Sequence, residues 1–143
     1  MVDSDGLEEM LRNFRRYMAE LQVAAQIPRA QFLSQPLVAA GAKYYLQVAI
    51  EACIDIARHI IATRGWRKPA DYRDVFSVLA ENGVVSSDFL PTLRTMAGYR
   101  NRLVHLYWEV SDEEAYTVLQ RDLADFHTFQ TAITRYLHKE GDL

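Results

Sequence analysis

Three polar residues near the end of one apolar stretch have types and spacings that suit chemistry: Arg100, Asn101 and His105. Arginine stays charged and presents a planar fork of donors to phosphate oxygens. Histidine titrates near neutral pH and suits general acid–base work. Asn101 and His105 are four residues apart, so they share one side of a helix. Together these residue types could bind a phosphate group and move a proton beside it.

Arg100 also interrupts an apolar seam. The seam has spacings of four, three, four, three and four residues, and it consists of Phe89, Leu93, Met96, Arg100, Leu103 and Tyr107. A guanidinium buried without a partner is very costly, so Arg100 must find a carboxylate, a carbonyl, a cavity or a ligand. A structural ion pair for Arg100 and a core or rim position for His105 account for the same pattern. The residues alone leave both interpretations open.

The spacing of Arg100 and His105 sets a geometric condition. Positions five apart are separated by about 140° around a straight helix. The two side chains therefore cannot both point into one pocket of a single regular helix. Either the helix loosens near Val104–His105, or the site lies in a groove where another helix or subunit meets this edge. A twofold dimer interface would satisfy the condition.

The composition favours one domain, residues 1–143, with a single hydrophobic core, because 143 residues are 50% hydrophobic. Only 6 Gly and 4 Pro argue against a fold of many tight turns and favour long helices. The net charge of −3 argues against a protein that wraps nucleic acid by charge alone. A pocket with a few local cations remains compatible with it, since the distribution of charge matters more than its sum.

The expected location is the cytoplasm. Cys53 is the only cysteine, so no internal disulfide can form, which suits a reducing compartment. The first residues show no signal-peptide pattern. No run approaches the roughly 18 uninterrupted apolar residues of a membrane span, so we expect no membrane partner.

Helical periodicity predicts an all-α, up-and-down bundle of about five helices. The fifth helix has a clear start, because Ser111 is followed three residues later by Glu114, as a capping box requires. Pro36 and Gly65 bracket the second helix. The expected helices cover Leu7–Leu21 with a break near Pro28, about Pro36–Thr63, Ala70–Glu81, Asp88–Tyr107 and Ser111 to Leu137, with a further short turn at Ala30–Leu33.

The segment from Arg100 to Tyr107, Arg-Asn-Arg-Leu-Val-His-Leu-Tyr, resembles the Arg-x4-His-x-Tyr pattern of the HepT branch of the HEPN superfamily. Ala52 to Ile61 resembles the second-helix signature of that family. Pro69 to Leu79, with Met96 to Tyr99 before the arginine, fits it as well. The resemblance covers roughly residues 37–137.

This resemblance implies a HEPN-like helical homodimer with a composite cleft where the two motif helices approach. It implies a metal-independent endoribonuclease, with no cofactor, that acts as the toxin of a type VII-like toxin–antitoxin pair. The partner would be an MntA-like nucleotidyltransferase antitoxin that adds AMP to Tyr107 and could build a higher assembly with the dimer. The RNA 2′-hydroxyl would then be the nucleophile. His105 would handle the proton and Arg100 would stabilise the phosphate, and Asn101 would orient one of these two side chains.

Other interpretations remain at this stage. Arg102 lies inside the motif and is a secondary candidate for RNA contact. Asp55 and His59, four apart, could offer two metal ligands, but no third is evident, so we expect no metal.

Two other functions compete with the ribonuclease: a non-catalytic helical adaptor that positions a nucleotidyltransferase partner, and a structural dimerisation bundle. The presence of Arg100, His105 and Tyr107 together favours the enzyme.

Overall fold

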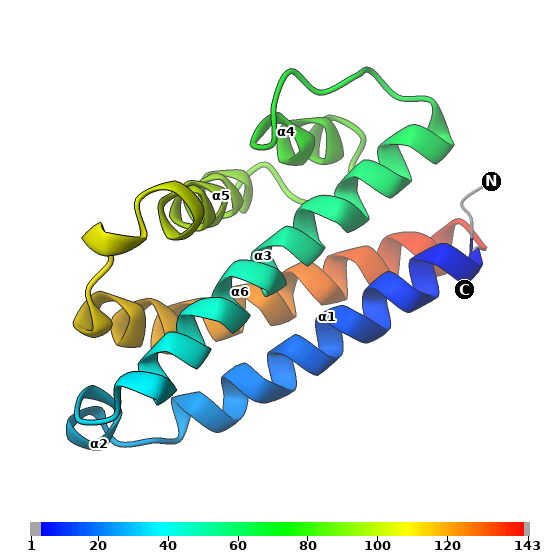
Figure 1. The fold of residues 1–143 in the computed structure, drawn as a ribbon. Helices are drawn as coiled ribbons and strands as arrows, with labels where there is room; N and C mark the ends of the chain where they lie inside the picture. Colours follow the sequence, from blue (N-terminus) through cyan, green and yellow to red (C-terminus); the bar gives the residue numbers. More distant parts are fainter. Residues whose placement is uncertain (1–3, 142–143) are drawn as a thin grey trace.

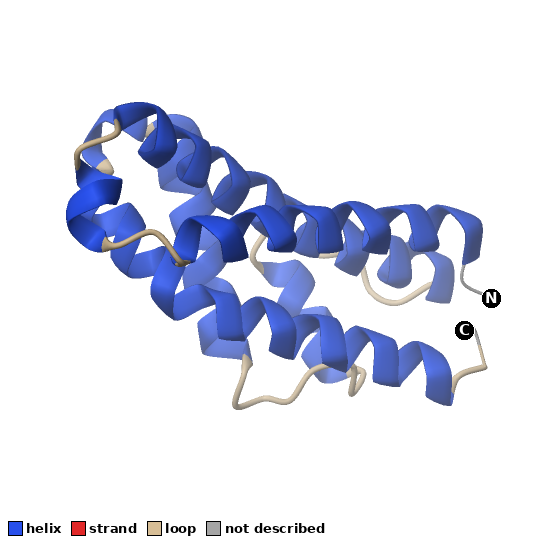
Figure 2. Cartoon of the chain, turned by 90° about the horizontal axis from the view of Figure 1, so that it is seen from below, coloured by secondary structure: helices blue, strands red, loops and turns tan. Residues whose placement is uncertain are grey.

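Long helices lying side by side form the frame of the structure, a computed structural model that describes residues 4–141 (Figure 1). Residues 1–3, part of the start in which we expect no signal peptide, lie outside the described residues. Helices occur throughout residues 4–141, and Figure 2 shows no strand among them. The elements are α1 (Ser4–Ala25), α2 (Arg29–Leu33), α3 (Pro36–Arg64), α4 (Asp74–Glu81), α5 (Leu90–His105), the 3-10 helix η1 (Tyr107–Glu109) and α6 (Asp112–Lys139).

The helices are arranged in a three-helix frame with a smaller pair on its side. α1, α3 and α6 contact one another, and α2 connects α1 to α3 at one end (Figure 1). α4 and α5 pack against α3 and against each other. The all-α prediction is confirmed. The short turn expected at Ala30–Leu33 is the separate helix α2, so the described chain has six α-helices rather than about five.

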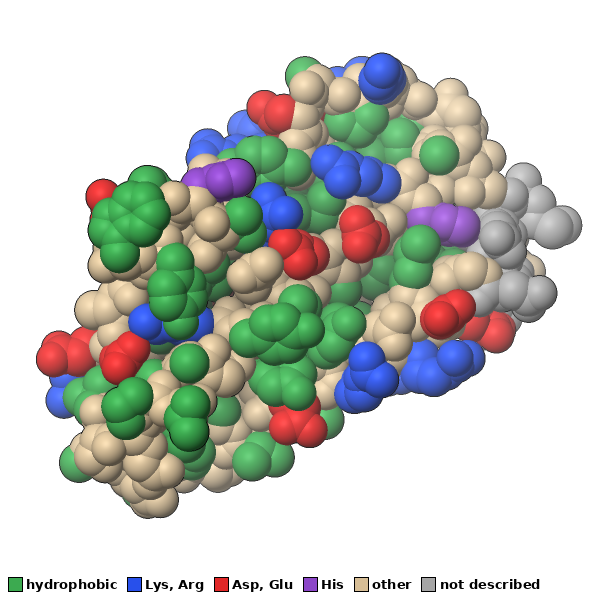
Figure 3. Space-filling view, viewed as in Figure 1, with side chains coloured by type: hydrophobic (Ala, Val, Ile, Leu, Met, Phe, Trp, Pro, Cys, Tyr) green, Lys and Arg blue, Asp and Glu red, His purple; other side chains and the backbone are tan. Residues whose placement is uncertain are grey.

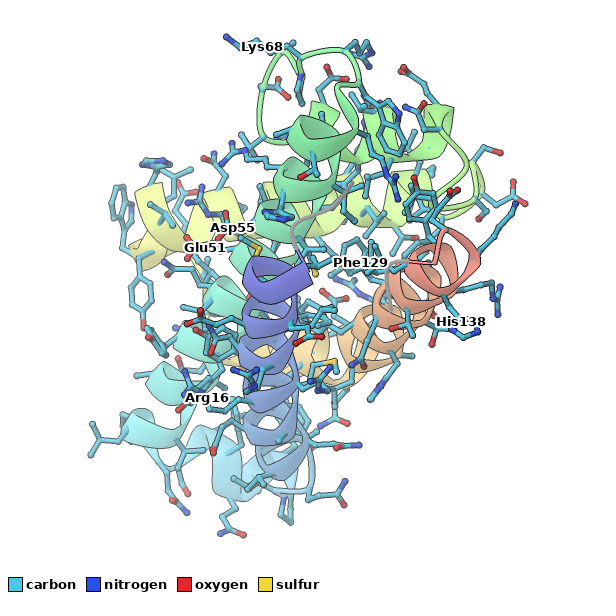
Figure 4. The ribbon with its side chains drawn as sticks, turned by 90° about the vertical axis from the view of Figure 1, so that its right-hand side faces the viewer. Arg16, Glu51, Asp55, Lys68, Phe129 and His138 are labelled. Atoms are coloured by element: carbon cyan, nitrogen blue, oxygen red, sulfur yellow. The ribbon has the colours of Figure 1, made fainter. Side chains whose placement is uncertain are left out.

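The core joins the frame to the smaller pair through aromatic side chains. The ring of Phe14 on α1 packs edge-on against Phe126 and Phe129 of α6, with centroids 5.9 and 6.1 Å away. Phe76 on α4 meets Phe129 in the same way at 6.1 Å. All four rings are fully buried, and Figure 4 shows Phe129 inside the bundle. This packing fixes α4, and with it the loop that precedes α4, against the frame.

The central helix, α3, is long and apolar enough to cross a membrane by length and composition alone. Its neighbours in the bundle give another reason for that composition. It contacts α1, α2, α4, α5 and α6, and thirteen of its side chains are buried. A helix that is surrounded by other helices must be apolar on several sides.

Two of the helix boundaries that differ from the sequence prediction have a local cause in the structure. α4 begins at Asp74 rather than Ala70, because the Asp71 carboxylate accepts the backbone N–H groups of Arg73 and Asp74 and holds a turn there. α5 ends at His105 rather than Tyr107, because Leu106 leaves the helical region at φ −134° and ψ 40°. The predicted cap of the last helix is confirmed, since the Glu114 N–H donates to Ser111 Oγ at 3.0 Å.

Candidate functional site

The helix α5 positions the Arg–His motif through its apolar face. Pro91 lies in its first turn, where a proline costs no hydrogen bond. α5 packs against α3 and α4, and its buried side chains are Leu93, Met96, Ala97, Tyr99 and Leu103. Arg100 therefore lies at the border of this face, half-buried, instead of in the middle of the core.

Arg100 forms an ion pair with Glu51 of α3. Its Nε and Nη2 atoms donate to Glu51 Oε2 at 2.9 and 2.8 Å, and Gln47 Nε2 donates to the same oxygen at 3.3 Å. Side-chain exposures of 25% for Arg100 and 29% for Glu51 show that the pair is partly open to solvent. The prediction that Arg100 must find a partner is confirmed, and the partner is a carboxylate.

A small cavity of about 150 Å³ lies beside this pair. It is lined by Glu51, Ile54, Asp55, Arg58, Tyr72 and Arg100. Figure 4 shows Glu51 and Asp55 next to each other on the side of α3 that faces α5. Burial raises the pKa of Asp55, although Arg58 and Arg100 oppose that effect. The cavity is thus lined by two carboxylates and two guanidinium groups, so that negative and positive groups are equal in number.

His105 and Asn101 lie on a different side of α5. His105 is the last residue of the helix and is exposed, while Asn101 is half-buried. Neither side chain forms a hydrogen bond within residues 4–141. The sequence left two alternatives, a looser helix near Val104–His105 or a groove shared with another helix or subunit. In the structure α5 stays helical through His105, and the chain departs from the helix at Leu106. Within one chain, Arg100 therefore occupies the groove with α3, and His105 stands free at the helix end.

Tyr107 has left the apolar seam that the sequence predicted. It lies in η1 with 45% of its surface exposed, next to Trp108, which is 77% exposed. In Figure 3, hydrophobic side chains gather at the end of the molecule where α5 runs into η1. The break at Leu106 turns the chain out of the helix, so the tyrosine points away from the core instead of closing it.

Lys43 is a residue that the sequence reasoning missed. It is only 6% exposed, and its Nζ atom lies 4.9 Å from the centroid of the Tyr107 ring. The same ammonium donates to the Val110 carbonyl at 2.8 Å and pairs with Asp112 at 2.8 Å. Lys43 therefore anchors both η1 and the start of α6. The sequence did contain a signal for it, because Lys43 is a lysine in the apolar pattern of α3, where a charged side chain needs a partner.

Arg102 faces α6 and is bound in the structure. Its guanidinium forms a two-pronged pair with Glu114, one prong of which measures 3.1 Å, and it also donates to the Glu109 carbonyl at 3.4 Å. The hydrogen bonds with Glu114 raise its pKa further above the usual arginine value. RNA contact by Arg102 stays a prediction, and its observed role is to join α5 to the start of α6.

The Asp55–His59 pair gains no further ligand. Over the part of the chain that the structure describes, no group of three or more His, Cys, Asp or Glu side chains could hold a metal ion.

The chain matches the family described as "Ribonuclease HepT-like" over residues 7–133. It belongs to the HepT-like ribonuclease family. The family prediction made from the Arg100–Tyr107 segment is confirmed, and the matched region extends further towards the N-terminus than the 37–137 expected.

Two named relatives of this HepT-like chain differ in the RNA given in their names. The "mRNA nuclease HepT" of Shewanella oneidensis is 39% identical over 84 residues, which cover 59% of this chain and 63% of that relative's length. The "tRNA nuclease HepT" of Aphanizomenon flos-aquae is 24% identical over 131 residues, which cover 92% of this chain and 89% of the relative.

A solved structure supports the HEPN-like fold. A tri-AMPylated Shewanella oneidensis HEPN toxin in complex with an MNT antitoxin superposes with a TM-score of 0.83 at 30% identity, covering 94% of this chain and 99% of that one. The helical frame, the α4–α5 pair and the motif helix are therefore arranged as in that toxin.

Proposed function

We propose that this protein is a metal-independent endoribonuclease and the toxin of a type VII-like toxin–antitoxin pair. The observation that carries the proposal is the Arg–His motif at the end of α5, where His105 is exposed and unbound while Arg100 is already oriented. Membership of the HepT-like family supports it. A structural bundle would have no need for a free histidine on the same helix as a half-buried arginine.

The chemistry would use the RNA's own 2′-hydroxyl as the nucleophile. His105 takes the proton from that hydroxyl while the bond from its oxygen to phosphorus forms. The bond from phosphorus to the 5′-oxygen breaks, and His105 returns the proton to this leaving oxygen, so the imidazole ends neutral. Arg100 stabilises the charge on the phosphate. Its Nη1 atom has no acceptor within residues 4–141, whereas Nε and Nη2 are held by Glu51.

The site would be composite, with Arg100 of one copy and His105 of a second copy acting on one phosphate. The two side chains lie on different sides of α5, which argues against a complete site within one chain. The exposed aromatic residues Tyr107 and Trp108 beside His105 supply apolar surface for a partner. A twofold axis near the end of α5 would bring the two motifs together and give two equal sites.

The activity would be controlled at Tyr107 by an MntA-like nucleotidyltransferase antitoxin. The related Shewanella toxin was solved in an AMPylated state with its MNT antitoxin. Here the Tyr107 ring is exposed, two residues after His105. An AMP group would add bulk and negative charge at the mouth of the cleft and would repel RNA phosphates.

The test is RNA cleavage by the purified protein in the presence of a metal chelator. We expect the wild-type chain to cut single-stranded RNA and the His105→Ala and Arg100→Ala variants to lose that activity. His127→Ala is the matched control, because His127 is exposed on α6, outside the motif helix. Cleavage by His105→Ala at the wild-type rate would overturn the proposal. Full binding of a nucleotidyltransferase with no RNA cleavage would favour the adaptor instead.

A further inference from the structure

The face of α5 that carries His105 continues along the whole helix. Arg94, Gly98, Asn101 and His105 follow one another at intervals of four, three and four residues, so they form one stripe. At 1.5 Å per residue the stripe extends about 16 Å from His105 back to Arg94. It is therefore long enough to lie along a nucleic-acid strand beyond the scissile phosphate.

A second arginine reaches this stripe from the loop before α4. A methyl group built on Gly98 would lie 3.5 Å from Nη2 of Arg73, so the Arg73 guanidinium covers the glycine. Tyr72 orients that guanidinium. The Arg73 Nε atom donates to the Tyr72 hydroxyl at 3.3 Å, and its Cζ atom lies 5.7 Å from the Tyr72 ring centroid. Arg73 and Arg94 both line an open groove of about 440 Å³.

Neither of these two arginines is neutralised by a carboxylate within residues 4–141. Arg94 donates to a neutral hydroxyl, Ser77 Oγ, at 2.8 Å, and the side chain of Arg73 has only Tyr72. Other arginines of the chain are paired, among them Arg67 and Arg102. An exposed guanidinium with donors to spare is suited to bind an anion.

The acidic residues of the same groove are occupied. Asp74 accepts two hydrogen bonds from Arg67, at 2.7 and 3.0 Å, and a third from the Ala70 N–H at 2.8 Å. Asp71 accepts the backbone N–H groups of Arg73 and Asp74 at 3.0 and 2.9 Å. The oxygens of these two carboxylates are therefore engaged with other donors, whereas Arg73 and Arg94 keep N–H groups free for an anionic ligand.

We propose that Arg73 and Arg94 bind phosphates of the RNA strand on one side of the cleavage point and so extend the cleft along α5. This inference rests on the proposed ribonuclease function. Gly98 lacks a side chain, which leaves room for the Arg73 guanidinium on the stripe between His105 and Arg94. Because the contacts are to phosphates, they strengthen binding of any sequence and set a minimum length of RNA.

The experiment measures the affinity for a single-stranded oligoribonucleotide as a function of salt, in a His105→Ala background that keeps the RNA intact. Each lost phosphate contact on a single strand lowers the slope of log affinity against log salt by about 0.7, so Arg73→Gln with Arg94→Gln should lower it by about 1.4. Arg73→Lys with Arg94→Lys should keep most of the slope, because the charges remain.

Two controls test whether a change in the salt slope comes from the charges of Arg73 and Arg94. One removes a charge elsewhere on the protein, and the other removes a hydrogen bond without removing a charge. Arg16→Gln removes an exposed arginine from α1, a helix that packs on α3 and α6 (Figure 4), and should leave the slope unchanged. Ser77→Ala removes the hydrogen bond to Arg94 but keeps its charge, and should also leave the slope unchanged. An unchanged slope in the double glutamine variant, or an equal loss with Arg16→Gln, would overturn the inference. Failure of the ribonuclease proposal would instead appear as cleavage that is independent of His105.

Discussion

The two sides of α5 use arginine in different ways. On the side facing α6, Arg102 is held by both oxygens of Glu114 and by the Glu109 carbonyl. On the side facing α3, Arg100 contacts a single oxygen of Glu51. Along the neighbouring stripe, Arg94 meets only a hydroxyl. Arg102 therefore has three acceptor atoms around its guanidinium, whereas Arg100 has one carboxylate oxygen and Arg94 one hydroxyl, and the proposals above assign RNA binding to the arginines with fewer acceptors.

The largest expected effect separates Arg100 and His105 from Arg102. We expect His105→Ala to lower kcat for RNA cleavage roughly 10²–10⁴-fold, the usual contribution of general acid–base catalysis. Arg100→Gln should cause a loss of similar size. Arg102→Gln should leave kcat near the wild-type value and lower the free energy of unfolding by no more than about 1 kcal/mol, because the Glu114 pair is partly exposed.

Steady-state cleavage and urea denaturation of the three variants together check this contrast. If Arg102→Gln removed the activity while the fold stayed intact, Arg102 would belong to the RNA-binding surface, and the division between the two sides of α5 would be wrong.

The next largest effect is on stability and concerns Lys43, which anchors η1. Lys43→Met leaves the Val110 carbonyl and the Asp112 carboxylate without their donor. We expect the free energy of unfolding to fall by about 1–3 kcal/mol, the cost of leaving a polar group unpaired. Urea denaturation measures it. Lys68→Met is the matched control, because Lys68 is exposed in the linker before α4 (Figure 4) and its loss should change little. Equal stability of the two variants would contradict the anchoring role.

The smallest effect concerns the acids that Arg67 neutralises. Hydrogen bonds from Arg67 hold the pKa values of Asp74 and Glu81 below their ordinary range. A folded-state pKa below the unfolded one gives stability that is present above about pH 4 and is lost as the pH falls further. The difference in unfolding free energy between wild type and Arg67→Gln should therefore shrink as the pH falls below that value.

Urea denaturation across a series of pH values checks the trend, with Arg16→Gln as a control that should show no such change. A difference that stays constant with pH would contradict it. Arg67→Gln also tests the groove, because a free Asp74 carboxylate would compete with RNA phosphates for Arg73 and Arg94.

The sequence predicted much of this arrangement from local patterns. The helix ends followed from Pro36, Gly65 and the Ser111 cap, and the need of Arg100 for a partner followed from its place in an apolar seam. Arg100 and Glu51 are 49 positions apart, and Lys43 and Val110 are 67 apart, so no local pattern could identify these pairs. Tyr107 was placed in the seam because the heptad spacing continues to it, whereas the break at Leu106 takes it out of the helix.

The central claim is that one cleavage site takes Arg100 from one copy and His105 from another. Mixing the inactive Arg100→Ala and His105→Ala proteins tests it most directly, after the subunits have been allowed to exchange. In a mixed dimer, one site regains both residues and the other loses both. Half of the dimers in an equal mixture are mixed and each has one complete site, so about a quarter of the wild-type cleavage rate should be recovered. A mixture as inactive as its two components would contradict the composite site and would mean that Arg100 and His105 of one site come from the same chain.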